Sequence, residues 1–340
     1  MSVLTFKSQE YKTFPDVLRD YAGYTVNIKG NSEKTVCEYL LDLRTFFRFY
    51  LMKKKDLDLS MDEFQKLSIK EIGIEDVQAV NSRMIIEYLM FAGFERENSP
   101  TTRMRKLSAL RSFYFYAHSK QRWVEVNPTS DIDSPKKKRT LPKYLTIEEA
   151  ITLLETVKSD TESKTVKRDY AIISTFLNTG MRLSELVGIN LESFDPDLTK
   201  VKVIGKGNKE RFIYLNDASR EAIKDYLRVR LDPKYVNTSD HAFFLSSRQK
   251  RISNKTVQWV IYRYLEMSGL GAKKLSVHKL RHTAATLMYQ TGKVDIRVLK
   301  EILGHEQLNT TQIYTHVVDK NIEEAMAQNP LSNVKIKSNK

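Results

Sequence analysis

The stretch D-S-P-K-K-K-R-T-L-P, Asp133–Pro142, decides how the chain is divided. Pro135 and Pro142 exclude regular helix or strand around them, and four consecutive cations lie between the two prolines. We therefore predict a basic linker over residues 133–143, between domains at residues 1–132 and 144–340. The linker is either a solvated hinge or a strap that crosses a phosphate backbone with its cations, Lys136, Lys137, Lys138 and Arg139.

The residues before this linker carry a helical pattern. Ser32–Tyr50 repeats apolar residues at Val36, Leu40, Leu43 and Phe47, the spacing of one helix face. Ser99–Ala117 opens with a serine cap followed by proline at the first helical position, which predicts a helix start. The pattern therefore predicts an all-helical N-terminal domain.

Cations lie beside the apolar stripe of the second of these helices. Arg103, Lys106 and Arg111 occupy other faces than the stripe formed by Met104, Leu107, Leu110 and Tyr114. These three side chains are candidates for contact with a nucleic acid, and the alternative for each is a solvated position.

After the linker the pattern is mainly helical, with one interruption. In Thr199–Leu215, β-branched and aromatic residues flank G-K-G-N-K, which predicts an antiparallel hairpin with Gly205, Gly207 and Asn208 in its turn. Lys206 then lies at the tip, either solvated or delivered to a ligand. The expected fold class is mainly α with a small antiparallel hairpin.

Composition limits the class of partner. The 340 residues include 56 Lys+Arg and 42 Asp+Glu, a formal net charge of +14. This surplus favours a polyanionic partner, first nucleic acid and second an anionic membrane surface. The sequence has no apolar run long enough to span a bilayer and no signal-peptide core at its start, and Cys37 is its single cysteine. We expect a reducing, cytosolic setting, with Cys37 a small buried thiol.

Three further stretches carry residues suited to phosphate chemistry. In Leu177–Ile189, Arg182 follows a helix end at Gly180, and an ion pair with Glu185 is the alternative to anion binding. In Leu275–Gly292, His278 and Arg281 share one helix face near its N-terminus.

The third stretch runs from the end of one expected helix into the next. Gly304 closes a helix, His305 follows, and Tyr314 comes nine residues later on an expected short helix. Taken together, Arg182, Lys206, His278, Arg281, His305 and Tyr314 suit phosphoryl transfer without a metal. Guanidiniums bind non-bridging oxygens, histidines donate or move protons, and a tyrosine hydroxyl attacks phosphorus.

Other site chemistries have less support. His278 and His282 have the i, i+4 spacing of a zinc motif, but Lys279 stands where the catalytic glutamate belongs and Arg281 would repel a cation. The sequence has no G-x-S-x-G, and G-K-G-N-K lacks the spacing of a phosphate-binding loop. We expect no metal and no cofactor.

The same residues resemble the tyrosine recombinases, the phage-integrase family. The order Arg, Lys, His-x-x-Arg, His, Tyr matches that family's catalytic signature. The wording is most similar to the Xer-type bacterial members, in T-G-M-R-L-S-E-L, V-I-G-K-G-N-K-E-R, H-K-L-R-H-T-A-A-T, L-G-H and T-T-Q-I-Y-T-H-V. One departure is Val277, where Xer-type proteins commonly have proline. The resemblance covers Pro142 to the C-terminus closely and residues 15–130 more weakly.

The resemblance implies a site-specific recombinase acting on double-stranded DNA. It implies that Tyr314 forms a 3′-phosphotyrosyl bond, that Arg182, Arg281 and His305 stabilise the phosphorus oxygens, that Lys206 protonates the leaving oxygen, and that His278 moves protons. No ATP is required, because the covalent ester conserves the bond energy. Integration, excision and chromosome-dimer resolution remain alternatives, as does the need for an accessory protein.

The resemblance also implies an architecture. An N-terminal helical core-binding (SAM-like) domain and a C-terminal catalytic domain form a C-shaped clamp on DNA, in a bacterial, nucleoid-associated setting. Four protomers join two DNA sites, and a helix at Asp319–Pro330 docks on a neighbouring protomer or on its own domain. The rival functions are a type IB topoisomerase, a telomere-resolving enzyme and a non-catalytic DNA-binding regulator.

Overall fold

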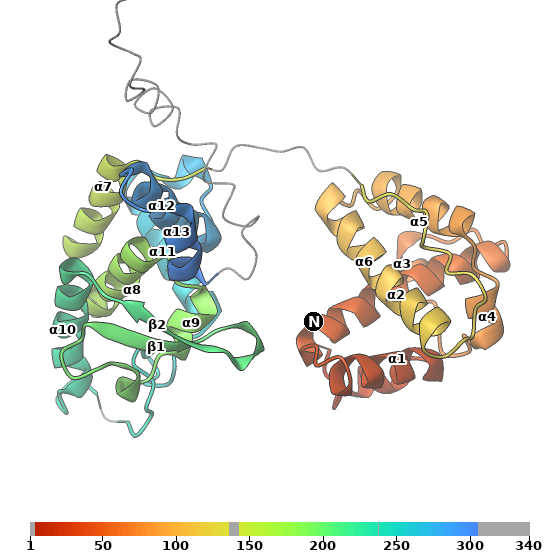
Figure 1. The fold of residues 1–340 in the computed structure, drawn as a ribbon, viewed down its shortest axis with the longest axis horizontal. Helices are drawn as coiled ribbons and strands as arrows, with labels where there is room; N and C mark the ends of the chain where they lie inside the picture. The colour runs from red at the N-terminus through yellow and green to blue at the C-terminus, as the bar shows by residue number, and fades with distance from the viewer. Residues whose placement is uncertain (1–3, 136–142, 237, 305–340) are drawn as a thin grey trace, which may run out of the picture. The chain divides into compact units, whose positions relative to one another are not determined.

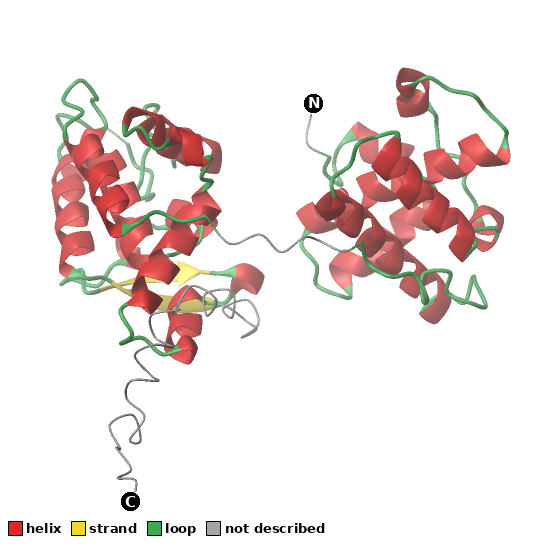
Figure 2. Ribbon diagram, turned by 90° about the horizontal axis from the view of Figure 1, so that it is seen from above, coloured by secondary structure: helices red, strands yellow, loops and turns green. Residues whose placement is uncertain are grey.

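The computed structural model describes residues 4–135, 143–236 and 238–304. The chain divides into two compact units, Met1–Arg139 and Thr140–Lys340, each with its own hydrophobic core. The described part is mainly helical, and its strands form one two-stranded antiparallel sheet (Figure 2). The predicted fold class, mainly α with a small hairpin, is confirmed. No helix among the described residues combines the length and the apolarity needed to cross a membrane.

Six α-helices and a short 3-10 helix form the described part of the first unit (Figure 1). Their bounds are η1 Gln9–Thr13, α1 Asp16–Asn27, α2 Glu33–Lys54, α3 Met61–Lys66, α4 Ile74–Gln78, α5 Ser82–Phe94 and α6 Pro100–Ser119. The predicted caps are in place, because the hydroxyls of Ser32 and Ser99 accept hydrogen bonds from the third backbone N–H of α2 and α6. Cys37 is buried, as the sequence indicated.

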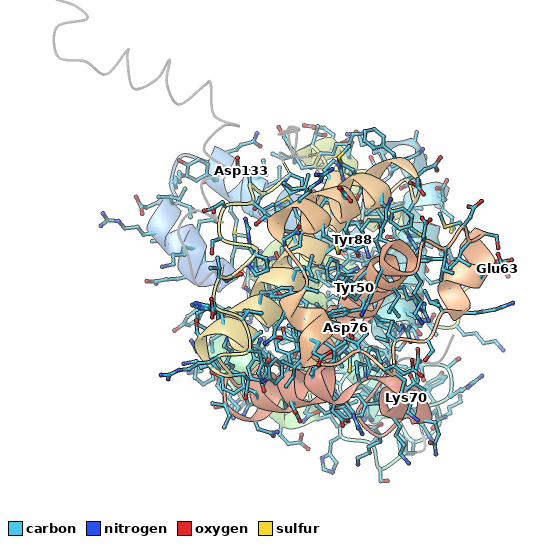
Figure 3. The ribbon with its side chains drawn as sticks, turned by 90° about the vertical axis from the view of Figure 1, so that its right-hand side faces the viewer. Tyr50, Glu63, Lys70, Asp76, Tyr88 and Asp133 are labelled. Atoms are coloured by element: carbon cyan, nitrogen blue, oxygen red, sulfur yellow. The ribbon has the colours of Figure 1, made fainter. Side chains whose placement is uncertain are left out.

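Aromatic side chains fill the core of this unit. Phe46 of α2 meets Tyr88 of α5 edge to face at 5.2 Å between ring centroids, and Phe47 meets Phe113 of α6 at 5.8 Å. The hydroxyl of the buried Tyr50 donates to Asp76 at 3.0 Å (Figure 3). The core therefore ties the three long helices α2, α5 and α6 together.

The second unit surrounds helix α8. The bounds of its elements are α7 Ile147–Lys158, α8 Val166–Thr179, α9 Leu183–Gly188, η2 Leu191–Ser193, β1 Lys200–Ile204, η3 Lys206–Asn208, β2 Glu210–Tyr214, α10 Asp217–Leu231, α11 Asn254–Met267, η4 Gly271–Lys273, α12 Val277–Gln290 and α13 Ile296–Leu303. Helix α8 contacts α7, α10 and α12, and its residues Ala171–Leu177 are buried on every side. The predicted capping box between Thr146 and Glu149 opens α7.

The hairpin forms where the sequence predicted it. Val203 of β1 pairs with Arg211 of β2, and the turn between the strands contains Gly207 at φ 74° and Asn208 at φ 60°. Both residues adopt the left-handed conformation that glycine and asparagine tolerate best. The outer face of the sheet exposes Phe212 and Tyr214, whereas Val201, Val203 and Ile213 face the core.

Candidate active site

Arg182 directly precedes helix α9 and is its N-cap residue. Helix α8 ends at Gly180, which has φ 60°, so the chain turns sharply between the two helices. The backbone N–H of Arg182 donates to Glu185 at 2.7 Å, and its guanidinium donates to the same carboxylate at 3.0 Å. The ion pair that the sequence offered as an alternative role for Arg182 is therefore present.

Arg281 lies in α12 and is buried, with 6% of its surface exposed. Its guanidinium donates to the carbonyl of Gly180 at 2.7 Å and to that of Leu303 at 2.6 Å. The side chain therefore joins the end of α8 to the end of α13, two segments more than 100 residues apart in the sequence.

The C-terminal end of α13 is where these arginines meet. Arg182 donates to the carbonyl of Gly304 at 2.6 Å, next to the Leu303 carbonyl bound by Arg281. Carbonyls at a helix C-terminus carry partial negative charge and lack intrahelical partners, so guanidiniums are suitable caps. Gly304 itself has φ 63° and ends the helix as predicted. His305 is the next residue in the chain.

A second arginine, Arg211, completes the set around Glu185. It comes from β2, and both terminal nitrogens contact the two carboxylate oxygens of Glu185, one of them at 3.1 Å. Its guanidinium also lies against Gly304, where an added Cβ would come within 2.8 Å of Arg211 Cζ. The sequence analysis assigned no role to Arg211. A signal was present, because the strand alternation places Arg211 on the same inward face as Ile213.

Glu185 is the common partner, and its side chain has no exposed surface. Burial alone would raise the pKa of this carboxyl, but hydrogen bonds from Arg211 and from the backbone N–H and guanidinium of Arg182 outweigh it and lower the pKa. The carboxylate therefore remains charged at neutral pH and fixes both guanidiniums.

The turn of the hairpin lies near the same carboxylate. A Cβ built on Gly205 would lie 3.5 Å from Glu185 Oε1, so the turn approaches the buried acid closely. The N–H of Gly205 donates to the carbonyl of Lys209 at 2.8 Å and closes the turn. Lys206 follows Gly205 directly, at the start of the short helix η3. The backbone of Lys206 thus lies one residue from the Glu185 cluster.

The two histidines of α12 differ in exposure. His278 is exposed in the first turn, one turn before Arg281. His282 is partly buried, and burial, together with neighbouring Arg281 and His278, lowers its pKa. Within the described residues no group of three or more His, Cys, Asp or Glu side chains is arranged to hold a metal ion.

Of the six signature residues, the structure thus brings Arg182 and Arg281 to the same helix end. His278 lies one turn before Arg281 in α12, and the backbone of Lys206 follows Gly205, which lies near Glu185. His305 and Tyr314 lie outside the described residues, and so does the predicted docking helix at Asp319–Pro330.

The candidate DNA-binding cations of the first unit divide into two kinds. Lys106 is buried, and its ammonium pairs with Asp42 Oδ1 of α2 at 3.1 Å, so the prediction that it contacts DNA is corrected. Arg103 and Arg111 are partly exposed, and Arg111 donates to Ser134 at 2.8 Å. The four linker cations, Lys136, Lys137, Lys138 and Arg139, lie outside the described residues.

Comparisons with known proteins identify the family of the chain. Residues 143–321 match the sequence model of the phage integrase family, and this span contains all six signature positions. The chain belongs to the phage integrase family. It is 46% identical to the tyrosine recombinase XerC of Caldanaerobacter subterraneus subsp. tengcongensis, over 94% of this chain and 88% of that protein. It is 36% identical to the tyrosine recombinase XerC of Thermodesulfovibrio yellowstonii, over 89% and 93% of the two chains.

Solved structures of this family share the fold. The XerH site-specific recombinase bound to its palindromic difH substrate, in a post-cleavage complex, aligns with a TM-score of 0.67 at 21% identity, over 92% of this chain and 94% of that one. A lambda integrase fragment, crystallised as a dimer on a COC′ core site, aligns with a TM-score of 0.60 at 15% identity, over 86% and 95%. At these identities the likeness establishes the fold.

Proposed function

We propose that this chain is a site-specific DNA recombinase of the tyrosine class, which cuts and rejoins double-stranded DNA through a 3′-phosphotyrosyl intermediate. One observation carries the proposal. Arg182 and Arg281, from two helices about 100 residues apart, both donate to carbonyls of the two residues that precede His305. Two positions of the signature are thereby held at one helix end, directly before a third in the sequence, and a phosphoryl-transfer site requires such convergence.

The reaction follows from the roles of these groups. The Tyr314 hydroxyl attacks the phosphorus, the Tyr314 oxygen–phosphorus bond forms, and the bond to the 5′-oxygen breaks. His278 accepts the tyrosine proton, and Lys206 gives a proton to the leaving 5′-oxygen. The 5′-hydroxyl of a partner strand then attacks the phosphotyrosine and restores the diester. One phosphate ester bond replaces another, so the cycle consumes no nucleotide.

The arginines stabilise the charge that develops on the non-bridging oxygens. Each preorganised donor of this kind is worth about 10²–10³ in rate. Glu185 and the carbonyls of Gly180, Leu303 and Gly304 hold the two guanidiniums in fixed orientations before substrate arrives. Fixed cations perform the charge stabilisation that metal ions supply in other phosphoryl-transfer sites, and the proposed reaction uses no metal.

Assembly on DNA belongs to the same proposal. We propose a homotetramer on two recombination sites, with exchange of the segment Asp319–Pro330 between protomers and with a possible accessory DNA-bending or regulatory protein. Arg103, Arg111 and the linker cations Lys136, Lys137, Lys138 and Arg139 are proposed contacts to the DNA backbone. The setting is the bacterial cytoplasm, on the nucleoid. The XerC relatives favour a Xer-type role, and dimer resolution, integration and excision share this chemistry.

Covalent trapping tests the proposed function. A nicked suicide substrate loses its short 5′-hydroxyl product after cleavage, so the protein–DNA ester accumulates. The wild-type chain should form an adduct that resists denaturation, and Tyr314→Phe should form none while it still binds the site. Absence of an adduct with wild type would leave the non-catalytic DNA-binding regulator as the better reading, whereas an equal adduct with Tyr314→Phe would assign the attack to another residue. Vigorous relaxation of a plasmid without a recombination site would instead favour a type IB topoisomerase.

A further inference from the structure

Arg211 bridges three separate segments of the second unit. It belongs to β2, its guanidinium contacts both oxygens of Glu185 in α9, and one terminal nitrogen lies 3.5 Å from the carbonyl of Leu303 at the end of α13. The side chain is 20% exposed. A planar guanidinium that contacts both oxygens of one carboxylate fixes direction as well as distance.

Through this contact the hairpin is attached to α9, as the strand register shows. Arg211 is paired with Val203 across the ladder, next to Ile204↔Glu210, the last pair before the turn. Gly205 begins that turn and approaches the carboxylate of Glu185, and Lys206 comes next. The arginine fork thus ties the strand that follows the turn to α9, and Gly205, at the start of the turn, lies near the same carboxylate.

The same guanidinium packs against Gly304, the residue that ends α13. A Cβ at Gly304 would come within 2.8 Å of both Arg211 Cζ and Arg211 Nε, so any larger residue there would displace the guanidinium. Arg211 therefore touches the residue before His305 on one side and anchors the turn that carries Lys206 on the other.

We infer that Arg211 is a positioning residue that holds the hairpin so that Lys206 can protonate the leaving 5′-oxygen. The inference rests on the proposed function, in which Lys206 is the general acid. Arg211 itself transfers no proton in this proposal. Its loss is expected to slow the protonation of the leaving group far more than it slows attack by Tyr314.

A sulfur substitution in the substrate separates these two effects. When sulfur replaces the bridging 5′-oxygen of the scissile diester, the leaving group is a thiolate whose conjugate acid has a pKa near 8.5, so it departs without a proton. The experiment measures single-turnover adduct formation by the full chain on nicked suicide substrates with oxygen or sulfur at that position. The variants are Arg211→Gln, Arg211→Lys and Lys206→Ala. The matched control is Arg228→Gln, which removes an exposed arginine paired with Asp225 at 3.1 Å in α10.

On the oxygen substrate Arg211→Gln should react about 10²-fold more slowly than wild type, the lower end of the range for a general acid. On the sulfur substrate the loss should shrink to a few-fold, as it should for Lys206→Ala. Arg211→Lys, which keeps the charge but loses the fork, should fall between. Arg228→Gln should match wild type on both substrates.

The ratio of sulfur to oxygen rates does not depend on how much of a variant is correctly folded, because both substrates meet the same active molecules. An equal loss on both substrates, or no loss on either, would overturn the inference for Arg211. If Arg211→Gln fails to fold, the same ratio measured on Arg211→Lys decides. Failure of the proposed function looks different: wild type would form no adduct on either substrate, or Lys206→Ala would gain nothing from sulfur.

Discussion

Each unit of the chain contains a buried carboxylate held by two cations, and the two sites behave differently. In the first unit Asp42 of α2 pairs with Lys106 and Arg105 of α6, at 3.1 Å and 2.6 Å. In the second, Glu185 pairs with Arg182 and Arg211. Burial raises the pKa of Asp42, with the two cations opposing it, whereas the hydrogen bonds to Glu185 overcome burial and lower its pKa.

The two sites differ in the further contacts that their cations make. Lys106 is enclosed, and burial lowers its pKa although Asp42 opposes the effect. The paired groups therefore join α2 to α6, and the Lys106 ammonium also lies over the ring of Tyr88 in α5 at 6.0 Å, so these contacts stay inside the helical bundle. Arg182 and Arg211, by contrast, extend past Glu185 to the carbonyls of Gly304 and Leu303. An ion pair inside a helical bundle contributes to the fold, whereas one whose arginines reach further segments organises a site.

Glu185→Gln should produce the largest change in stability. It leaves two guanidiniums without their anion, and removing one partner of a buried pair costs about 3–5 kcal/mol. Asp42→Asn should cost less, about 1–3 kcal/mol, because the buried charge is already disfavoured there. Urea unfolding can follow each unit through its own tryptophan, Trp123 in the first and Trp259 in the second, with the other tryptophan replaced by phenylalanine.

The control for both variants is Glu87→Gln, which removes a partly exposed carboxylate paired with the exposed Arg83. Its unfolding free energy should stay within about 0.5 kcal/mol of wild type. A larger loss for Asp42→Asn than for Glu185→Gln would reverse the comparison.

The two acids should respond to pH with opposite sign. Glu185 has a folded pKa below its ordinary 4.5, so its contribution is present above that pH and is lost as pH falls through the folded pKa. Asp42 has a folded pKa above its ordinary 3.8, so its titration favours the folded state below that pH, and the effect is lost as pH rises through the folded pKa. Unfolding free energies from pH 7 to pH 3, each compared with the Gln or Asn variant, measure both slopes. Parallel slopes would show that the two sites are equivalent.

A pair of glycines provides a smaller test. Gly304 has φ 63° beside Arg211, and Gly30 in the first unit has φ 68° with no atom within 4 Å of an added Cβ. Gly30→Ala should cost about 1–2 kcal/mol from backbone strain alone. Gly304→Ala should cost more, and it should also slow adduct formation, because the new methyl group displaces Arg211. Equal costs and unchanged cleavage would mean that Arg211 does not sit against Gly304.

Much of the fold was accessible from the sequence because its signals are local. Ser32, Ser99 and Thr146 cap the helices they were expected to cap, and G-K-G-N-K forms the turn of the hairpin. The burial of Lys106 was not accessible, because it depends on Asp42, 64 residues earlier, which lies opposite in the packed unit. Packing of α6 against two helices widens its buried face beyond one stripe.

The residue types of the site could be predicted from the sequence, but the hydrogen bonds between them could not. Arg182 and Arg281 lie at one helix end, but the carbonyls they bind at Leu303 and Gly304 follow only from the tertiary structure. Arg211 was overlooked because a cation in a hairpin is usually solvated. Its inward position in the strand alternation, beside Ile213, was the signal that a buried partner exists.

The central claim is that the arginines gathered at the end of α13 serve catalysis and not only binding. The most direct measurement compares Arg182→Ala with wild type, for both affinity to the recombination site and the single-turnover rate of adduct formation. We predict a rate lower by about 10²–10³, with affinity changed by less than about tenfold because many other phosphate contacts remain. Loss of affinity that accounts for the whole loss of adduct, or an unchanged rate, would contradict the account.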